Sequence, residues 1–313
     1  MIRDRGSTRN DKDMVEDMSE RHATPDESES TREATSSIRT NARPLIWVVT
    51  PVYNGERYLA ECIESVLAQT YGEWRYLVVD NRSTDRTAEI AGRYTASDPR
   101  ISMSQNEQFL PVIENWNHAL RALPNDAAYC KVVHADDVIY PECLERMIAV
   151  AEKYSQVGLV SSYVKHGAEI RQTEGVPRSS EIISGREICR ATLEDKRFVF
   201  GSPTSLLMRA DLVRAREYFY NEENIHADTE ACFDVLRTTD LGFVHDVLSH
   251  TRLHDAAITP GLLKINTYAL GWLIILIKYG SYYLERNAYM RRLALAVWRY
   301  VWFLGKATLR GKL

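Results

Sequence analysis

From residue 44 onward, short runs of β-branched and aromatic residues alternate with stretches of helical periodicity. The runs LIWVVT (45–50) and RYLVVD (75–80) are followed by predicted helices over residues 56–69 and 85–95. This alternation is typical of β-α-β units, in which a helix connects two parallel strands. The sequence therefore predicts an α/β fold with a mostly parallel sheet flanked by helices.

The same pattern continues through the middle of the chain. Further strands are predicted at ISMS (101–104), YCKVVH (129–134) and VGLVSS (157–162). Residues 115–120 belong to a predicted helix, and residues 141–154 form another one with a proline in its first turn.

Composition divides the 313 residues into three parts. Residues 1–43 are charged and rich in Ser and Thr, with a net charge of −2, and we expect them to be a disordered tail. Residues 44–260 carry a net charge of −10 and contain the predicted sheet. Residues 261–313 have nine basic residues and one acidic residue, a net charge of +8, and we expect a helical extension rich in aromatic residues.

The five cysteines are widely spaced and form no CxxC pair. This spacing argues against a disulfide framework or a zinc site and fits a reducing cytosol. No apolar run follows the first methionine, so no signal peptide is expected.

Polar clusters follow three of the predicted strands, at residues 51–55 (PVYNG), 80–85 (DNRSTD) and 134–137 (HADD). In open α/β sheets, ligands bind at the carboxyl ends of the strands, where loops converge and helix N-termini point at the crevice. We therefore expect the three clusters to line one crevice.

Two adjacent carboxylates, Asp136 and Asp137, lie at one of these strand ends. A divalent cation such as Mg²⁺ or Mn²⁺ would offset their charge, because these ions prefer hard oxygen ligands. The alternative is that the pair caps the helix expected to begin at residue 141. Spacing alone leaves both explanations open.

Read together, these segments resemble family 2 glycosyltransferases. The shared blocks are TPVYN, SVLAQTY, VVDNRSTDRT and HADD, in the order and spacing of that family, and the resemblance extends over about residues 45–259. It implies a GT-A-type fold with a nucleotide-binding sheet, and a catalytic domain over residues 44–260.

The resemblance also assigns residues to the donor site. The residues that it places at the nucleotide sugar are Pro51, Tyr53, Asn54, Glu56, Asp80 and Asn81. Among them, Asp80 would accept a hydrogen bond from the ring N–H of the base.

At the HADD motif, the resemblance makes Asp136 the ligand of a Mn²⁺ or Mg²⁺ ion held against the donor's diphosphate, with Asp137 as a supporting carboxylate. His134 stands where the family usually has another Asp. A neutral imidazole there would still hydrogen-bond a ribose hydroxyl, although metal affinity would be weaker.

On the acceptor side, the resemblance implies that Asp228 is the general base and that His254 lies near the diphosphate. The family's glutamate before the base is Ala227 here. Taken alone, Asp228 is an N-cap for a helix over residues 229–238 and His254 is a structural histidine.

The segment Gly201–Val213, which includes Ser202, is similar to the part of the family that faces the acceptor. Its plain interpretation is a turn followed by a buried strand. Trp116 and Asn117 either line a ligand pocket or belong to the core.

The implied function is metal-dependent transfer of a hexose, with inversion, from a UDP-, GDP- or dTDP-sugar to a glycan or lipid-linked acceptor, in surface polysaccharide or glycolipid synthesis. The alternative is a nucleotide-sugar-binding protein with weakened or lost turnover, because of His134 and Ala227. A dinucleotide-dependent oxidoreductase is not expected, since TPVYNGE lacks GxGxxG. Nor is a nucleic-acid partner, because the only basic surface is aromatic and terminal.

Residues 261–308 are expected to form two helices interrupted near Gly280. Their longest apolar stretch, YALGWLIILI, is shorter than the roughly 20 residues of a membrane span. One explanation is packing on the catalytic domain or on a second subunit of a homo-oligomer. The other is an amphipathic pair on an anionic membrane surface, which would make a cytoplasmic protein peripheral at the inner face of the plasma membrane.

Overall fold

The computed structural model describes residues 43–171, 176–195, 199–224, 226–254 and 267–309. Apart from Arg43, the tail expected over residues 1–43 lies outside this part of the chain. Residues Arg43–Leu313 form a compact unit of their own.

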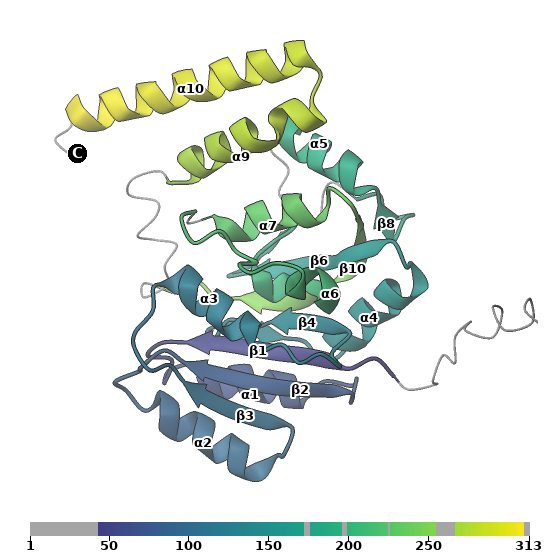
Figure 1. The fold of residues 1–313 in the computed structure, drawn as a ribbon, viewed down its shortest axis with the longest axis vertical. Helices are drawn as coiled ribbons and strands as arrows, with labels where there is room; N and C mark the ends of the chain where they lie inside the picture. Colours follow the sequence, from purple (N-terminus) through teal and green to yellow (C-terminus); the bar gives the residue numbers. More distant parts are fainter. Residues whose placement is uncertain (1–42, 172–175, 196–198, 225, 255–266, 310–313) are drawn as a thin grey trace, which may run out of the picture. The chain divides into compact units, whose positions relative to one another are not determined.

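A single sheet runs through this unit (Figure 1) in the order β3-β2-β1-β4-β9-β6-β10-β5, with β7 paired to β6 and β8 to β10. The strands are β1 (Ile46–Val52), β2 (Trp74–Asp80), β3 (Ile101–Gln105), β4 (Tyr129–Val132), β5 (Val138–Ile139), β6 (Val157–His166), β7 (Glu169–Arg171), β8 (Ile182–Ile183), β9 (Leu207–Arg209) and β10 (Asp240–Thr251).

The central pairings confirm the mostly parallel sheet. Strands β1, β2, β3 and β4 are parallel neighbours, as are β6 and β10. The short strand β9 lies antiparallel between β4 and β6 and joins the two parallel groups. It is the buried strand expected within the segment Gly201–Val213.

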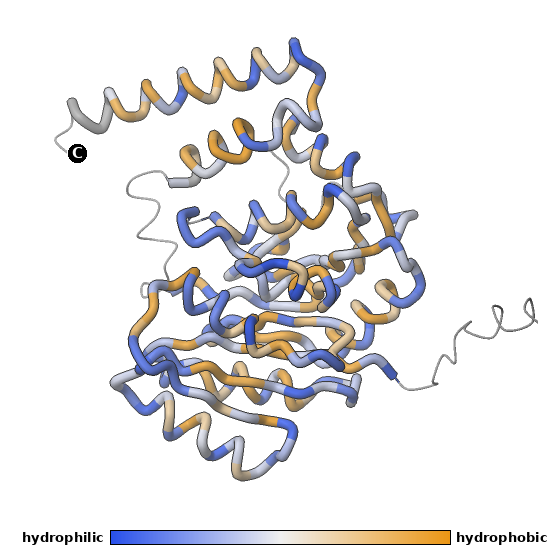
Figure 2. Tube along the Cα trace, in the orientation of Figure 1, coloured by the Kyte–Doolittle hydropathy of each residue, from blue (hydrophilic) through white to orange (hydrophobic). Residues whose placement is uncertain are grey.

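Helices cover both faces of the sheet. They are α1 (Leu59–Leu67), α2 (Thr87–Ser97), α3 (Val112–Arg121), α4 (Cys143–Lys153), α5 (Gly185–Asp195), the 3₁₀ turn η1 (Pro203–Ser205), α6 (Ala210–Arg214), α7 (Ala227–Val235), α9 (Thr267–Tyr283) and α10 (Arg286–Leu309). Successive β1 residues point to opposite faces, because side chains alternate along a strand. Ile46 and Val48 belong to a core cluster with residues of α1, α2 and α4, whereas Trp47 and Val49 belong to a second cluster with residues of α3, α5, α7 and α9. The strands are correspondingly rich in apolar residues (Figure 2).

Two predicted helix boundaries are wrong. The helix expected over residues 141–154 begins at Cys143, so its proline precedes the first turn. The helix expected over residues 229–238 is α7, which begins at Ala227 and ends at Val235. Its N-cap is His226, so Asp228 is not the capping residue.

The two helices expected in the C-terminal part are α9 and α10, but Gly280 itself lies inside α9, just before the break. The break falls between Tyr283, where α9 ends, and Arg286, where α10 begins. A Cβ atom at Gly280 would lie 2.5 Å from the ring of Tyr289 on α10. The glycine therefore permits the close approach of the two helices and does not end the first one.

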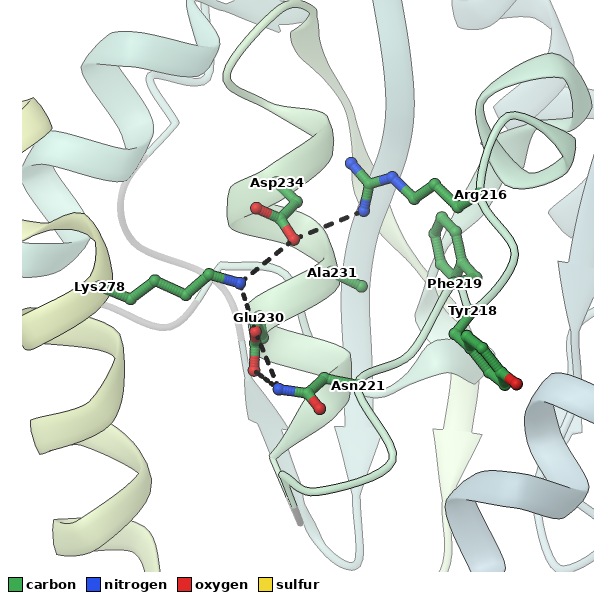
Figure 3. A pocket seen from close by; sticks show the side chains of 8 residues that line it. All are labelled: Arg216, Tyr218, Phe219, Asn221, Glu230, Ala231, Asp234 and Lys278. Carbon is green, nitrogen blue, oxygen red and sulfur yellow. Dashed lines mark hydrogen bonds and ion pairs between the residues drawn. The ribbon is translucent and has the colours of Figure 1, made fainter.

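The helix α9 packs on α7 beside a cavity of about 250 Å³ (Figure 3). Arg216, Tyr218, Phe219, Asn221, Glu230, Ala231, Asp234 and Lys278 line this cavity. Lys278 Nζ on α9 lies 2.5 Å from Glu230 Oε1 and 3.7 Å from Asp234 Oδ2, both on α7.

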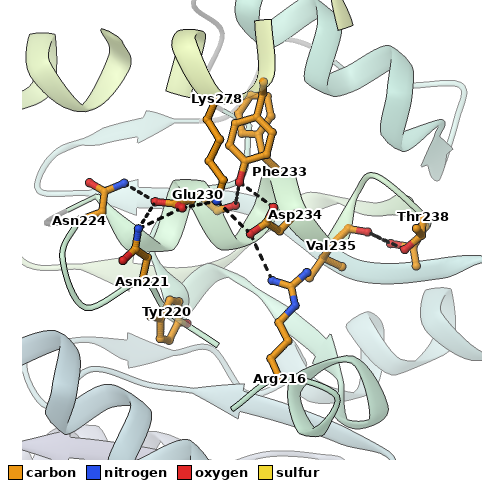
Figure 4. A network of polar contacts seen from close by, with 12 residues as sticks. Arg216, Tyr220, Asn221, Asn224, Glu230, Phe233, Asp234, Val235, Thr238 and Lys278 are labelled. Atoms are coloured by element: carbon orange, nitrogen blue, oxygen red, sulfur yellow. Dashed lines mark hydrogen bonds and ion pairs between the residues drawn. The ribbon is translucent and has the colours of Figure 1, made fainter. Parts of the chain in front are cut away.

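The polar network extends on both sides of this pair (Figure 4). Asn224 Nδ2 donates to Glu230 Oε2 at 2.6 Å, and Arg216 Nη1 lies 3.6 Å from Asp234 Oδ2. Burial works to raise the pKa of Glu230, but the hydrogen bonds from Asn224 and Lys278 outweigh it and the pKa lies below its usual value. The charges on this helix interface are therefore satisfied by one another.

We expect Lys278→Met to reduce the free energy of unfolding by about 1–3 kcal/mol, because it removes a charged donor from a buried carboxylate. The side chain of Glu230 is only 4% exposed in this pair. Lys153→Met is the matched control, since its pair with Glu181 has a similar distance, 2.6 Å, but both side chains are about half exposed. Urea unfolding of both variants tests this, and equal losses of stability would contradict it.

Candidate functional site

The loops that follow β1 and β2 are joined by hydrogen bonds. Asn54 donates its backbone N–H to Ser83 Oγ at 2.9 Å and accepts from the backbone N–H of Thr84 at 2.8 Å. Gly55 N–H donates to Thr87 Oγ1 at 2.8 Å. Asn54 has φ 50°, in the left-handed region that asparagine tolerates better than most residues. Two of the polar clusters expected at the strand ends therefore form one connected edge.

Glu56 adds to this connection. Its backbone N–H donates to Asp85 Oδ2 at 2.9 Å, and its carboxylate accepts from the backbone N–H of Arg86 at 3.2 Å. In this arrangement Glu56 holds the two loops together.

The side chain of Asp80 is fully buried at the end of β2. One carboxylate oxygen accepts from the backbone N–H of Ser83 at 3.1 Å, and the other accepts from Gln105 Nε2 at 2.7 Å. These donors fix the orientation of the carboxylate. Its role at a nucleotide base stays a prediction.

Asn81 is engaged within the protein. Its Oδ1 accepts from Asn106 Nδ2 and from the backbone N–H of Leu110, and its Nδ2 donates to the Leu110 carbonyl at 2.8 Å. The side chain is 3% exposed. These contacts make Asn81 an anchor for the loop that precedes α3.

That loop contains Phe109, an aromatic residue of the site that the sequence analysis missed. The ring of Phe109 packs edge-on against Tyr53, with centroids 4.9 Å apart, and both rings are about half exposed. Pro51 lies behind them in β1, buried and paired with Val79 of β2. Two exposed rings at the edge formed by the loops after β1 and β2 provide a surface on which a planar base can stack.

Asp137 is buried and ties three segments together. Its Oδ2 accepts from Thr204 Oγ1 at 2.6 Å and from Thr251 Oγ1 at 3.4 Å, and its Oδ1 accepts from the backbone N–H of Arg252 at 3.2 Å. Burial, together with the neighbouring charge of Asp136, raises its pKa to about 7. With 1% exposure, Asp137 is placed to hold the loop in position, whereas the neighbouring Asp136 is partly exposed.

Asp136 points the other way and meets His254. Its Oδ2 lies 3.0 Å from His254 Nε2, and about a third of its side chain is exposed. The tilted ring of Tyr58, 4.9 Å away, covers the histidine, whose Nδ1 is buried without a hydrogen-bond partner among the described residues. The two residues that the resemblance places at the diphosphate are thus in direct contact.

Neither carboxylate caps α4. The N-cap of that helix is Glu142, with no side-chain capping bond, and both Asp136 and Asp137 are bonded elsewhere. The capping alternative is therefore wrong.

Arg252 is a second residue that the sequence analysis missed. Its guanidinium lies over the ring of Tyr58 at 4.9 Å and pairs with Glu61, while Nη1 is buried without a hydrogen-bond partner within the described ranges. It is separated from His254 by a single residue. The end of β10 therefore supplies a cation and an imidazole at the tip of the HADD loop.

His134 packs between the helix α3 and the η1 turn. Its ring stacks on Trp116 with centroids 4.8 Å apart, and its backbone N–H donates to Thr204 Oγ1 at 3.1 Å. Burial lowers its pKa, which favours the neutral imidazole. Its Nε2 is buried without a partner in the described part of the chain. A contact with ribose stays a prediction.

Trp116 connects His134 to the segment before α7. Its other contact is the ring of Tyr220, edge-on at 5.5 Å, and Asn117 fixes the same segment by accepting from the Tyr220 N–H and donating to its carbonyl. Asn117 is buried, which favours the core interpretation for it, whereas Trp116 is only partly buried.

Asp228 lies in the first turn of α7. Its Oδ1 accepts from the backbone N–H of Thr229 at 2.7 Å, and burial raises its pKa. Burial raises the pKa of the Tyr220 hydroxyl, and the charges of Cys232 and Asp228 add to this effect. A carboxylate with a raised pKa is better suited to accept a proton than an ordinary one.

Ser202 lies just before η1, which borders the same loop. Its hydroxyl is 3.5 Å from Thr251 Oγ1, and its carbonyl accepts from Ser205. The fully buried Lys131 holds η1 against β4 by donating to the Thr204 carbonyl at 2.5 Å and to the Leu206 carbonyl at 3.1 Å. Burial lowers the pKa of this amine.

The described residues contain no group of three or more His, Cys, Asp or Glu side chains arranged to hold a metal ion. Mg²⁺ and Mn²⁺, however, are commonly bound through one or two carboxylates together with substrate phosphates. Asp136 is partly exposed, and beside it His254 has a buried nitrogen without a partner in the described part of the chain. This donor set fits an ion that is bound together with a diphosphate.

Comparison with known proteins agrees with the resemblance seen in the sequence. The model of the family described as "Glycosyl transferase family 2" matches residues 47–215. Glycosyltransferase GlyG of Streptococcus pneumoniae serotype 4 is 31% identical over 221 residues, which cover 68% of this chain and 72% of GlyG. The chain spans 56%, 66% and 72% of the length of three known relatives.

Solved structures share the fold. TarS 1-349 of S. aureus in complex with UDP-GlcNAc has a TM-score of 0.59 and 19% identity, covering 82% of this chain and 72% of that one. The mannosyltransferase PcManGT of Pyrobaculum calidifontis, in complex with GDP-Man and Mn²⁺, has a TM-score of 0.59 and 16% identity, covering 87% and 77%. These likenesses confirm the GT-A-type sheet.

The raised pKa of Asp137 predicts a pH effect on stability. The folded protein holds this proton more tightly than the unfolded chain, so the contribution of Asp137 to the free energy of unfolding falls as pH rises from about 4 to 7, by an amount on the order of 4 kcal/mol. In Asp137→Asn this term is absent. The stability of the variant relative to the wild type should therefore rise across that window, in urea unfolding with EDTA.

Asp98→Asn is the control with the opposite sign. The hydrogen bond from Arg100 lowers the pKa of Asp98, so its contribution to stability is lost as pH falls. The relative stability of this variant should therefore decline as pH rises. A pH dependence of Asp137→Asn that follows the wild type would contradict the buried, proton-holding carboxyl.

Proposed function

Because the chain belongs to glycosyltransferase family 2, we propose that it transfers a sugar from a nucleotide-sugar donor to an acceptor hydroxyl, with inversion at the transferred carbon. The observation that carries this proposal is that Asp80, Asp136 and His254 follow the carboxyl ends of mutually parallel strands of one mostly parallel sheet, with Asp136 and His254 in contact. A base pocket and a diphosphate site at the same edge are what a nucleotide sugar requires.

At the donor end, Asp80 binds the base and Tyr53 stacks against it. The oriented carboxylate of Asp80 and the exposed ring of Tyr53 with its neighbour Phe109 support this assignment. Asn54 and Glu56 hold the loops that form the pocket. UDP-, GDP- or dTDP-sugars are the donors we propose, since TarS and PcManGT are complexed with UDP-GlcNAc and GDP-Man.

A Mn²⁺ or Mg²⁺ ion is proposed at Asp136, with His254 beside it. When bound, such an ion stabilises the negative charge that develops on the diphosphate as the bond to the sugar breaks. PcManGT, which shares the fold, is complexed with Mn²⁺. Asp136 and His254 supply an oxygen and a nitrogen ligand, and the guanidinium of Arg252 lies next to them for the remaining phosphate charge.

Asp228 is proposed as the general base. Its carboxylate takes the proton of the acceptor hydroxyl while the hydroxyl oxygen forms a bond to the anomeric carbon, and the bond to the diphosphate breaks on the opposite side. This single displacement inverts the anomeric centre, so an α-linked donor gives a β-glycoside. Asp228 is partly buried, and desolvation raises its pKa, which supports this role. Ser202 and the η1 segment border the acceptor side.

The acceptor is proposed to be a glycan or a lipid-linked sugar in surface polysaccharide or glycolipid synthesis, with a hexose as the transferred group. Residues 44–260 would form the catalytic domain and residues 261–313 a basic extension of a cytoplasmic protein. The net charge of +8 in that extension supports an acceptor held at an anionic surface.

The second candidate function is nucleotide-sugar binding with weakened or lost turnover. The observation that favours it is His134, which stands in place of a family carboxylate, stacks on Trp116 and has a buried Nε2. An assay for free nucleotide released from a donor in the presence of Mn²⁺ separates the two functions.

We expect Asp228→Asn to lower the rate of transfer by about 10²–10⁴-fold, since an amide cannot accept the proton in the transition state. Affinity for the donor should stay at the wild-type level in a thermal-shift titration with a panel of nucleotide sugars. Asp246→Asn, an exposed carboxylate on β10, is the matched control and should retain full activity. Undiminished transfer by Asp228→Asn would remove this residue from the mechanism.

Asp136→Ala is expected to abolish the stabilisation that Mn²⁺ adds to nucleotide-sugar binding. In the wild type, a ligand at 100 times its dissociation constant stabilises the fold by about 2.7 kcal/mol. Calorimetry with and without EDTA measures the metal-dependent part directly. An unaltered metal dependence in the variant would place the ion elsewhere.

A further inference from the structure

The helix α10 exposes an extended apolar surface. Its large apolar side chains that are at least two-fifths exposed are Met290, Leu295, Val297, Trp298, Val301 and Trp302. We call this set the α10 apolar face. Trp298 is 62% exposed, and its ring stacks on that of Trp302 with centroids 6.4 Å apart. Contiguous apolar surface of this kind is uncommon on soluble proteins unless something binds it.

This face is separate from the one that attaches α10 to the fold. Tyr289, Leu293 and Ala296 recur at helical spacing and pack partly against the core that includes α7 and α9. Arg292 adds a hydrogen bond from Nη1 to the Leu193 carbonyl of α5 at 3.3 Å. Packing against the rest of the protein is thus provided by one side of the helix, and the α10 apolar face lies on the other.

The charge of the helix is of one sign. Between residues 286 and 305 it carries four arginines and no acidic residue. Arg286, Arg291 and Arg299 are exposed, and within the described residues none of the four arginines forms an ion pair with a carboxylate. Hydrophobic and hydrophilic residues alternate along this helix in Figure 2.

We propose that α10 binds an anionic lipid surface, with the α10 apolar face entering the boundary between headgroups and acyl chains and the arginines contacting the lipid phosphates. Exposed Trp side chains favour this boundary, because an indole has an apolar body and a polar N–H. A basic helix with aromatic residues on its apolar side is the usual form of an interfacial anchor. None of the described helices has the length and hydrophobicity that a membrane span requires.

Charge favours a lipid over a second copy of this chain. A symmetric dimer through the same face would bring the exposed Arg291 and Arg299 of one helix close to those of the other, without an acidic residue of either helix between them. An anionic bilayer has the complementary sign. The same bilayer repels residues 44–260, which carry a net charge of −10. The charge distribution therefore orients the protein with α10 toward the membrane.

The test is flotation of the full chain with vesicles of one part phosphatidylglycerol to two parts phosphatidylcholine, and with phosphatidylcholine alone. We expect binding to the anionic vesicles only. The variant Trp298→Ser/Val301→Ser/Trp302→Ser should remain in the soluble fraction. Arg291→Gln/Arg299→Gln should bind about 30-fold more weakly at low salt, and the difference should shrink in about 1 M NaCl.

The matched control is Ile170→Ser/Arg171→Gln, which removes one exposed apolar and one exposed basic side chain from β7 and should bind like the wild type. Circular dichroism melting checks that every variant is folded. The proposal is overturned if the wild type does not bind anionic vesicles at low salt or if the triple variant binds as well as the wild type. It is also overturned if light scattering shows a wild-type oligomer that the triple variant dissociates. The experiment requires no turnover, so its outcome is independent of the proposed sugar transfer.

Discussion

The buried carboxylate of Asp137 is the interaction on which the arrangement of the candidate site depends. Burying a carboxyl group is costly unless hydrogen bonds compensate for the lost hydration. Here the donors come from Thr204 and from the end of β10, residues that are far from Asp137 in sequence. The loop after β4, the η1 turn and the end of β10 are therefore fixed to one point. His254 lies three residues beyond Thr251 and reaches Asp136 from that point.

This arrangement explains why two adjacent carboxylates stand at the end of a buried strand. Asp137 is turned inward and connects the segments, while Asp136 is partly exposed and available to a ligand. The negative charge of Asp136 contributes to the raised pKa of Asp137, after burial itself. A positively charged group close to the loop therefore stabilises the two adjacent carboxylates. Arg252, which donates its backbone N–H to Asp137 and whose buried Nη1 has no partner among the described residues, is one such group within the protein.

The sequence predicted the parallel sheet and the position of its polar edge because hydrophobic periodicity and strand-end clusters are local signals. It did not predict the contact between Asp136 and His254, since 118 residues separate them and nothing local links the two. Gly280 was interpreted as a helix break because the same residue type serves both for breaks and for close packing, and only the position of Tyr289 decides between them. Asp228 resembled an N-cap because residue type and spacing alone do not show at which residue the helix begins, and the N-cap is in fact His226. Phe109 lies in a loop without periodicity, and its contact with Tyr53 depends on the anchoring of that loop by Asn81.

The helix α7 connects the two parts of the molecule for which functions are proposed, the candidate site and the C-terminal helices α9 and α10. Glu230 and Asp234 are four residues apart and therefore lie on the same side of α7, where Lys278 of α9 contacts both. Asp228 precedes Glu230 by two residues, so its side chain points to a different side of the helix. Gly271 brings α9 against the residue before this turn, because a Cβ atom there would lie 2.2 Å from the ring of His226. The contacts with α9 thus fix the rotation of α7 about its axis, and with it the direction in which Asp228 points. Because α10 packs on α9, a surface that binds α10 also restrains α9 and, through it, α7. The side of the site at which the acceptor is proposed to bind is thereby restrained as well.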